Sequence, residues 1–370
     1  MSLEHNGILI RTGSAKEGAS TLFDLLTYAE LLGIEHYILS SPVDDGLSIL
    51  LQAHPTLSDG CACDTLQLSA RLQFSSIASE DDLEREIFLS MLLSPVTFEY
   101  PSYAEFEAAI RVRLNIVEAA RRSALCFDTK KIERPPEFWR YSEERGFTLR
   151  PEKSLIDALR MATQPEISGQ CYSFSCYRAT EYVYALGIAQ ELVMSNPELL
   201  AQLQHHCESR AIMSRNFHDT FLREYGSMSD PLPPRYYVPG DRVWFRNPDE
   251  RSSDVEGYEG SWVIYLGDGL FNNFWKQGQP YTLTEKCVEI YHWRSGVYED
   301  AHGALHMDES IVDARKKATL DDPAELEQVL ERVMRLRDPG GTYANGGCID
   351  ATREYPRWVC TGTSDIVLPK

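Results

Sequence analysis

The amino-acid sequence predicts an α+β fold. One observation is a series of amphipathic helical patterns in the first half of the chain, in which apolar side chains recur every three or four positions. A second is a run of short apolar segments separated by turn residues between positions 242 and 275, which is typical of antiparallel strands. The sequence contains no repeat of about 20–50 residues, so neither a solenoid nor a propeller is expected.

The first third of the chain is expected to form three helices and a short strand. Apolar positions have helical spacing over residues 20–32, with Ser20 as the expected N-cap. The same spacing recurs over residues 79–93 and 102–123. Both of these helices start at a serine, and the earlier one has an acidic first turn, which the helix dipole favours. Residues 36–41 have the composition of a strand.

The middle of the chain predicts a hairpin, a short helix and then a longer helix that begins at a cysteine. Apolar segments at residues 138–141 and 147–149 flank Gly146, a turn residue. Residues 154–161 are expected to form the short helix, and the next helical pattern starts near Cys176. A helix N-terminus offers unpaired N–H groups and a partial positive charge, which lower the pKa of a thiol and can hold an oxyanion.

Antiparallel strands are expected after this helix. Residues 242–246 and 262–266 have strand patterns, and Asp268-Gly269 forms a hairpin turn into a strand at residues 270–275. Residues 309–337 are expected to be helical and heavily charged. A helix headed by a cysteine and followed by successive antiparallel strands is the arrangement of papain-like (NlpC/P60-type) thiol enzymes.

The chain is strongly acidic. Its 370 residues include 36 Lys+Arg and 56 Asp+Glu, which gives a net charge of −20 at pH 7. Nucleic acids and anionic lipids attract basic surfaces, so neither a nucleic acid nor a membrane is expected as a partner. The nine cysteines are an odd number and do not indicate a disulfide framework, and the N-terminus lacks the pattern of a signal peptide. A cytoplasmic location is therefore expected.

Five segments of the sequence, in order, carry a resemblance to a known family. They occupy residues 94–120, 138–161, 171–180, 239–249 and 260–275, the last three reading CYSFSCYRAT, PGDRVWFRNPD and GSWVIYLGDGLFNNFW. The sequence resembles the spore-coat type of bacterial protein-glutamine gamma-glutamyltransferase, a transglutaminase, over about residues 94–294. The resemblance implies a transglutaminase-like domain over residues 94–300, an N-terminal α/β addition over residues 1–93 and a helical, turn-rich C-terminal extension over residues 301–370.

Cys176 falls on the family's nucleophile. The resemblance implies that its thiolate attacks the side-chain carboxamide of a protein glutamine, releases ammonia and leaves a thioester. A lysine amine then resolves the thioester into a cross-link, or water resolves it by deamidation. The implied partners are a protein glutamine donor and a lysine acceptor, and the resemblance implies no metal and no organic cofactor.

Three positions depart from the family pattern. Ser175 replaces a glutamate directly before the nucleophile, Ser261 replaces a second glutamate, and Phe274 replaces a histidine. Losing a general base typically slows such a reaction by about 10²–10⁴-fold. A binding or structural module that has lost catalysis is therefore the alternative function.

Other residues are candidates to replace the missing groups. Glu259 lies two positions before the second missing glutamate and would point to the same face of a strand. Asn273 adjoins the missing histidine and would enter the site through a one-residue bulge. An imidazole that folds back onto Cys176 would also fit a papain-like peptidase. The histidines beyond the matched strands are His292, His302 and His306.

Several residues have both a functional and a structural interpretation. Four aromatic residues would form an apolar slot for glutamine and lysine stems, or would simply pack in the core: Trp139, Tyr172, Trp262 and Trp275. Cys176 would otherwise be an inert buried thiol, and Cys171 is expected to pack in the core. The cluster His205-His206-Cys207 has no partner pair at zinc spacing, so a solvated helix face is expected there.

Overall fold

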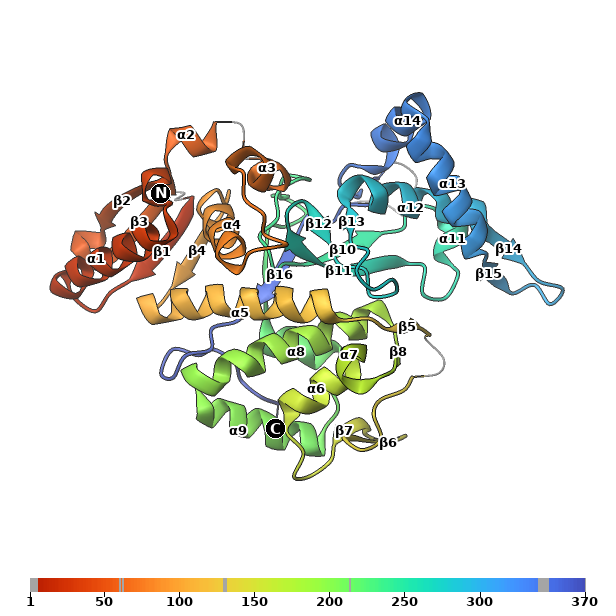
Figure 1. Ribbon diagram of the computed structural model, residues 1–370, viewed down its shortest axis with the longest axis horizontal. Helices are drawn as coiled ribbons and strands as arrows, with labels where there is room; N and C mark the ends of the chain where they lie inside the picture. The colour runs from red at the N-terminus through yellow and green to blue at the C-terminus, as the bar shows by residue number, and fades with distance from the viewer. Residues whose placement is uncertain are drawn as a thin grey trace.

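The computed structural model describes residues 6–59, 61, 63–128, 132–212, 214–338 and 346–369. Its fold is α+β, which confirms the prediction from the sequence. The long helix α5 (Tyr103–Arg122) runs through the middle of the molecule and separates two layers (Figure 1). An N-terminal unit and the main sheet lie on one side of α5, and a group of helices lies on the other.

A four-stranded sheet forms the centre of the N-terminal unit. Its strands are β1 (Gly7–Arg11), β2 (Ile38–Val43), β3 (Ser48–Ala53) and β4 (Thr97–Tyr100), in the order β2-β3-β1-β4. Strand β4 lies beyond residue 93 and pairs in parallel with β1. The helices of this unit are α1 (Ala15–Leu32), α2 (Pro55–Ser58), α3 (Leu68–Leu72) and α4 (Glu80–Leu92), with 3₁₀ turns η1 (Glu35–Tyr37), η2 (Asp44–Gly46) and η3 (Thr65–Gln67).

Two predicted boundaries in this unit are wrong. Helix α1 begins at Ala15 and not after Ser20, because Ser14 is the N-cap: its Oγ accepts a hydrogen bond from the Glu17 N–H (3.3 Å). The strand expected at residues 36–41 starts later, because the turn η1 occupies its beginning. The helix α4 confirms the prediction there, including its serine cap and acidic first turn.

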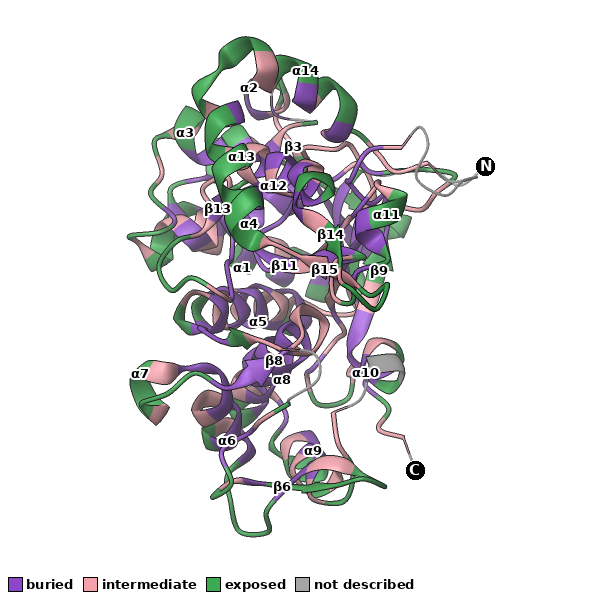
Figure 2. Cartoon of the chain, turned by 90° about the vertical axis from the view of Figure 1, so that its right-hand side faces the viewer, coloured by how far each residue is buried: buried purple, intermediate pink, exposed green. Residues whose placement is uncertain are grey.

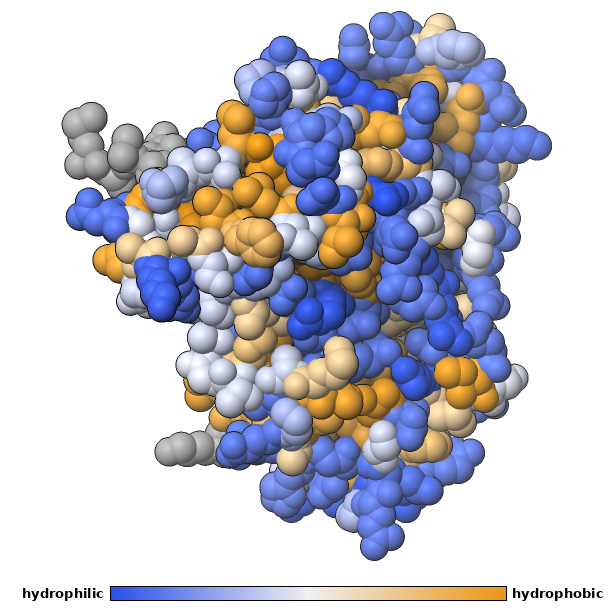
Figure 3. Space-filling view, turned by 60° about the vertical axis from the view of Figure 1, so that its left-hand side comes forward, coloured by the Kyte–Doolittle hydropathy of each residue, from blue (hydrophilic) through white to orange (hydrophobic). Residues whose placement is uncertain are grey.

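The N-terminal unit carries exposed apolar side chains. Figure 3 turns this side of the molecule forward and shows hydrophobic residues gathered among hydrophilic ones. The large hydrophobic residues exposed on this unit include Phe23, Leu26, Leu31, Leu39 and Leu47. Strand β2, to which one of them belongs, is an edge strand of its sheet.

Helix α8 (Cys176–Ser195) packs along α5 on the other side of the molecule. The two backbones approach closely at Gly187, where a Cβ atom would lie 2.5 Å from Cγ1 of Ile116. The predicted hairpin and short helix are confirmed as β6, β7 and α6. The remaining elements of this layer are α6 (Leu155–Thr163), α7 (Pro165–Ser168), α9 (Pro197–Ser209) and α10 (Ser214–Phe221), with strands β5 (Cys126–Phe127), β6 (Trp139–Ser142), β7 (Gly146–Leu149) and β8 (Ser173–Phe174).

The main sheet has six antiparallel strands in the order β13-β12-β11-β10-β16-β9. Its strands are β9 (Leu222–Tyr225), β10 (Arg242–Arg246), β11 (Gly260–Gly267), β12 (Leu270–Phe271), β13 (Tyr281–Thr282) and β16 (Arg353–Pro356). Apolar side chains of β10, β11 and β12 form one buried cluster with those of α12. The elements around this face are α11 (Glu250–Ser253), α12 (Leu283–Gly296), α13 (Glu309–Asp321), α14 (Pro323–Val333), β14 (Val297–Glu299) and β15 (Leu305–Met307).

The predicted β10, the turn at Asp268-Gly269 and the helical region from Glu309 are confirmed, but one prediction in this region is wrong. The strand expected at residues 270–275 ends at Phe271, because the side chain of Asn273 folds the chain into a turn. Its Oδ1 accepts hydrogen bonds from the backbone N–H groups of Trp275 (3.1 Å) and Lys276 (3.2 Å). The region expected to be helical from Glu309 consists of two helices, α13 and α14, because Asp322 caps a new helix that starts with a proline.

Buried residues concentrate where α5, α8 and the main sheet meet, and the peripheral helices are largely exposed (Figure 2). Each of the nine cysteines, all of which lie within the described residues, is a free thiol. Within the described ranges, no helix has the length and apolar character that spanning a membrane requires.

Candidate functional site

Cys176 is the first residue of α8 and lines an open cavity of about 410 Å³. The walls of the cavity come from β5, the turn before β11, and the helices α12 and α13. Ser175 is the N-cap of α8, and its Oγ accepts a hydrogen bond from the Arg178 N–H (3.3 Å). The predicted helix start is therefore confirmed, and the half-buried Cys176 faces the open cavity.

The environment of the Cys176 sulfur has opposing effects on its ionisation. Burial raises the pKa of the Cys176 thiol above its ordinary value. The backbone amides of Trp262 and Tyr177 and the positive charges of Lys286 and Arg242 counteract part of this rise in pKa. The sulfur therefore has amide donors and cations around it, which is the environment that a thiolate requires.

Lys286 is a cavity residue that sequence reasoning did not identify. It is 2% exposed, and its Nζ lies 3.1 Å from Glu289 Oε1. The other oxygen of Glu289 binds Lys316 Nζ at 3.0 Å, and both ammonium groups lie over the ring of Tyr281. Burial alone would raise the pKa of Glu289, but the charges of the two lysines hold this pKa below its ordinary value. The sequence signal was the Lys/Glu pair three residues apart on one helix face.

The structure brings only some of the expected site residues to this cavity. Cys176, Ser261 and Trp275 line it. Glu259 is exposed and does not line the cavity, since its Oε1 accepts a hydrogen bond from the Gly257 N–H (3.3 Å) within its own turn. Asn273 is buried in the turn described above and does not reach the cavity either. Phe274, which occupies the position of the missing histidine, is 2% exposed and packs in the core.

The other expected aromatic residues lie elsewhere. Trp139 is buried against Tyr182, and its Nε1 donates a hydrogen bond to the Ala158 carbonyl (3.1 Å). Tyr172 is buried in the same hydrophobic core. The Trp262 ring lines a second cavity of about 370 Å³ beside the main sheet, although its backbone amide is next to the Cys176 sulfur.

No imidazole lines the Cys176 cavity among the residues that the structure describes. His292 is buried, with Nε2 2.7 Å from the Thr319 hydroxyl. His306 lies 3.0 Å from Asp300 in the β14–β15 hairpin, and His302 lies in the turn of the same hairpin. These positions remove the structural basis for a papain-like peptidase with a Cys–His pair.

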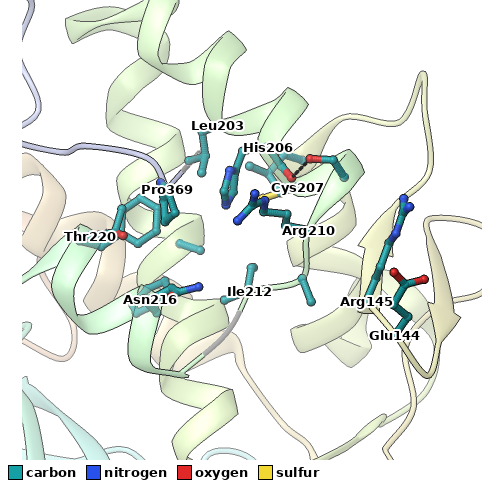
Figure 4. Close-up of a pocket in the computed structure, with 16 residues that line it drawn as sticks. Glu144, Arg145, Leu203, His206, Cys207, Arg210, Ile212, Asn216, Thr220 and Pro369 are labelled. Atoms are coloured by element: carbon teal, nitrogen blue, oxygen red, sulfur yellow. Dashed lines mark hydrogen bonds between the residues drawn. The ribbon is translucent and has the colours of Figure 1, made fainter.

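A third cavity, of about 210 Å³, lies between α9, α10 and the end of the chain (Figure 4). Apolar side chains such as Leu203 and Ile212 surround it, and Cys207 and His206 line it from α9. The prediction of a solvated helix face at residues 205–207 is wrong for Cys207. This residue is 2% exposed because α9 turns it toward this cavity. Within the described residues, no group of three or more side chains is arranged to hold a metal ion.

Cys171 is exposed and not in the core as expected. It precedes β8, whose partner strand β5 places the exposed Cys126 beside it. Burial and the neighbouring Cys126 sulfur raise the pKa of Cys171. Cys171 is therefore a surface thiol outside the Cys176 cavity.

Glu181 lies farther along α8 and is expected to make stability depend on pH. It is fully buried, and burial raises its pKa to about 7 despite an ion pair with Arg178. The unfolded chain ionises this carboxyl near pH 4.5, so stability is lost as pH rises from about 4.5 to 7. Over this range the free energy of unfolding of the wild type should fall by up to about 3 kcal/mol relative to that of Glu181→Gln.

Denaturant unfolding of both proteins at several pH values between 4.5 and 7.5 measures this difference. A difference in the free energy of unfolding between wild type and Glu181→Gln that stays constant across the pH range would contradict the prediction. Glu224→Gln is a matched control, because it makes the same change of side chain at an exposed position on a strand.

This chain is similar in sequence to known proteins. A family model described as "Protein-glutamine gamma-glutamyltransferase" matches residues 65–366. Proteins of that name from Halalkalibacterium halodurans and Bacillus subtilis are each 26% identical to this chain, over 217 and 189 residues. These matches cover 56% and 49% of this chain and 69% of each relative. A solved transglutaminase from Geobacillus stearothermophilus, without its C-terminal extension, aligns with a TM-score of 0.38 and 19% identity, covering 59% of this chain and 98% of that chain.

Proposed function

The chain belongs to the protein-glutamine gamma-glutamyltransferase family, and from this premise we propose that it transfers the acyl group of protein glutamine side chains through a thioester on Cys176. The observation that carries the proposal is the position of the sulfur. It lies at the N-terminus of α8, in an open cavity, with the backbone amides of Trp262 and Tyr177 beside it. Such amides stabilise a thiolate and the oxyanion that forms when it attacks a carboxamide.

The proposed first step forms a thioester. The Cys176 sulfur bonds to the side-chain carbonyl carbon of the glutamine, the C–N bond breaks, and the thiol proton leaves with the amide nitrogen as ammonia. In the second step a lysine amine attacks the thioester and returns a proton to the sulfur, which leaves an isopeptide cross-link. Water in place of the amine gives glutamate instead. Trp275 lines the cavity and supplies an apolar wall for the glutamine stem.

The proposal includes a papain-like core. Helix α8 carries the nucleophile and contacts β11, which pairs antiparallel with β10, so a cysteine-headed helix lies against a later antiparallel sheet. The proposal assigns no proton transfer to Glu259 or Asn273, because both side chains are bonded within their own turns.

A catalytically inactive binding module is the second candidate. The observation that favours it is the set of side chains at the positions where the family resemblance implies acid/base groups. Ser175 is an N-cap, Phe274 is a core residue, and Ser261 is the one of the three that lines the cavity. A module of this kind would hold a glutamine side chain without breaking its C–N bond.

One experiment separates the two candidates. The full chain is incubated with a glutamine donor protein whose lysines are methylated, with and without a fluorescent primary amine. Amine incorporation and ammonia release are measured for the wild type, Cys176→Ala and Cys171→Ala, the last being a control because that thiol is exposed outside the cavity.

The enzymatic proposal predicts that the wild type and Cys171→Ala release ammonia with or without the amine and label the donor when it is present. Cys176→Ala should give neither product. Equal signals from the wild type and Cys176→Ala would refute the enzymatic proposal, and donor binding without product would establish the module.

A further inference from the structure

We propose that Lys286 is the charge partner of Cys176, supplying from α12 the positive charge that a catalytic thiolate obtains elsewhere from an imidazolium. The juxtaposition that supports this is a shared cavity: both residues line it, and Lys286 is almost fully buried there. The consequence for turnover rests on the proposed acyl transfer, but the effect on the thiol itself does not.

The ammonium group of Lys286 has a fixed position. Its Nζ is bound to Glu289 at 3.1 Å and lies 4.4 Å from the centre of the Tyr281 ring. A long lysine side chain loses much of its conformational freedom in such a site, so its charge stays at the cavity wall and does not extend into solvent. A fixed charge is what a preorganised electrostatic site requires.

A second lysine keeps the charge of Lys286 available to the sulfur. Alone, Lys286 and Glu289 would form a neutral pair. Lys316, from the neighbouring helix α13, binds the other oxygen of Glu289 at 3.0 Å. Two lysines around one carboxylate leave a net charge of about +1 on this cluster, and it faces the cavity that holds Cys176. The positive charge of Lys286 lowers the pKa of the Cys176 thiol, which burial raises.

Apart from Arg242, the other ionisable groups around the cavity do not supply this charge. Lys276 lines the cavity, but it is exposed and bound to Asp313 of α13 at 3.2 Å. Glu309, also from α13, accepts a hydrogen bond from the Tyr258 hydroxyl (2.7 Å). Cys126 lines the wall that β5 provides. Arg242 contributes positive charge from the β10 side of the sulfur. Its guanidinium group lies over the rings of Tyr177 and Trp262 and is ion-paired to Glu354.

The inferred step is a simple ionisation. The Cys176 thiol loses its proton to water in the open cavity, and the thiolate forms beside the ammonium group of Lys286. No bond to Lys286 forms or breaks. Removing the ammonium should therefore leave the thiol intact but shift its ionisation to higher pH.

Alkylation of Cys176 as a function of pH tests this inference. The full chain is treated with iodoacetamide between pH 6 and 10. Alkylation of Cys176 is measured by mass spectrometry from fragment ions that separate it from Cys171, so that the exposed cysteines do not contribute. The variants are Lys286→Met, Lys286→Arg, Lys316→Met and, as a matched control on the exposed face of α13, Lys317→Met.

At pH 7, Lys286→Met should slow alkylation of Cys176 about 5- to 50-fold, which corresponds to a pKa increase of roughly one unit. Lys316→Met should slow it in the same direction but less, and Lys286→Arg and Lys317→Met should stay close to the wild type. Equal pH profiles for the wild type and both Met variants would overturn the inference. If Lys286→Met does not fold, as judged by circular dichroism, the pH profile of Cys176 alkylation in Lys316→Met tests the inference in its place.

The outcome is distinguishable from failure of the proposed function. If the wild type transfers no acyl group but alkylation shifts as expected in Lys286→Met, the proposed activity is refuted and the role of Lys286 as charge partner is supported. A wild type that transfers acyl groups with no shift in Lys286→Met retains the activity and refutes the charge partner.

Discussion

Substitution of Asp241 by alanine is expected to reduce the free energy of unfolding by about 3–5 kcal/mol, because it leaves a buried charge without its partner. Asp241 is fully buried, and its Oδ1 lies 2.9 Å from Nη1 of Arg113, which is also buried. Its Oδ2 accepts hydrogen bonds from the Val238 N–H (2.8 Å) and from the Tyr225 hydroxyl. One carboxylate therefore connects α5 with β9 and with the segment that leads into β10.

Urea unfolding at neutral pH measures this loss, with the slope of the transition compared between variants. A matched control is Glu99→Ala, because Glu99 forms an ion pair of the same length with Arg11 but both side chains are about half exposed. Exposed pairs contribute only about 0–1 kcal/mol. A loss below 1 kcal/mol in Asp241→Ala would show that the protein relaxes around the unpaired Arg113, contrary to the prediction.

Local signals in the sequence predicted the starts of several helices. Serine caps at residues 79, 102 and 154 have their effect within one helical turn, so a single sequence is enough to place them. The predicted start of the first helix, Ser20, is too late. The true cap is Ser14, and the charged residues that follow it interrupt the helical spacing of apolar residues. The strand at residues 270–275 was overextended because an asparagine side chain competes with the sheet for backbone N–H groups, and periodicity does not record that competition.

The candidate site could be predicted only in its local part. Cys176 at the start of α8 follows from neighbouring residues. Lys286 and Glu289 reach the same cavity from a helix that starts more than one hundred residues later, and only tertiary packing brings them there. Glu259 was expected on the face of a strand, but β11 starts at Gly260, so the alternation of side chains does not extend to it.

The family resemblance implies Cys176 as the expected nucleophile and marks three positions that depart from the family pattern, but it does not supply replacements for them. At the three departing positions, the structure has a helix cap, a core phenylalanine and a cavity serine. The buried charge cluster on α12 and α13 lies outside the five matching segments, so no comparison of motifs within those segments would have revealed it.

Substitution of Glu105 by alanine is expected to release the end of the chain and to cost about 2–5 kcal/mol, because it leaves buried donors without an acceptor. Glu105 is 1% exposed near the start of α5. Its carboxylate accepts hydrogen bonds from the backbone N–H groups of Val359 (2.6 Å) and Cys360 (3.0 Å) and from the Thr363 hydroxyl (2.6 Å). This one side chain therefore fastens a segment more than 250 residues away.

Hydrogen exchange at residues 357–366 is the direct measurement, since a local opening should remove protection there before the rest of the protein unfolds. Limited proteolysis should cut the same segment first. Glu118→Ala is the matched control, because Glu118 lies on the same helix but is exposed and makes only an i,i+4 ion pair with Arg122. If protection of the segment is unchanged in Glu105→Ala, then the packing of Val359 and Trp358 against the core, and not the carboxylate, holds the end of the chain in place.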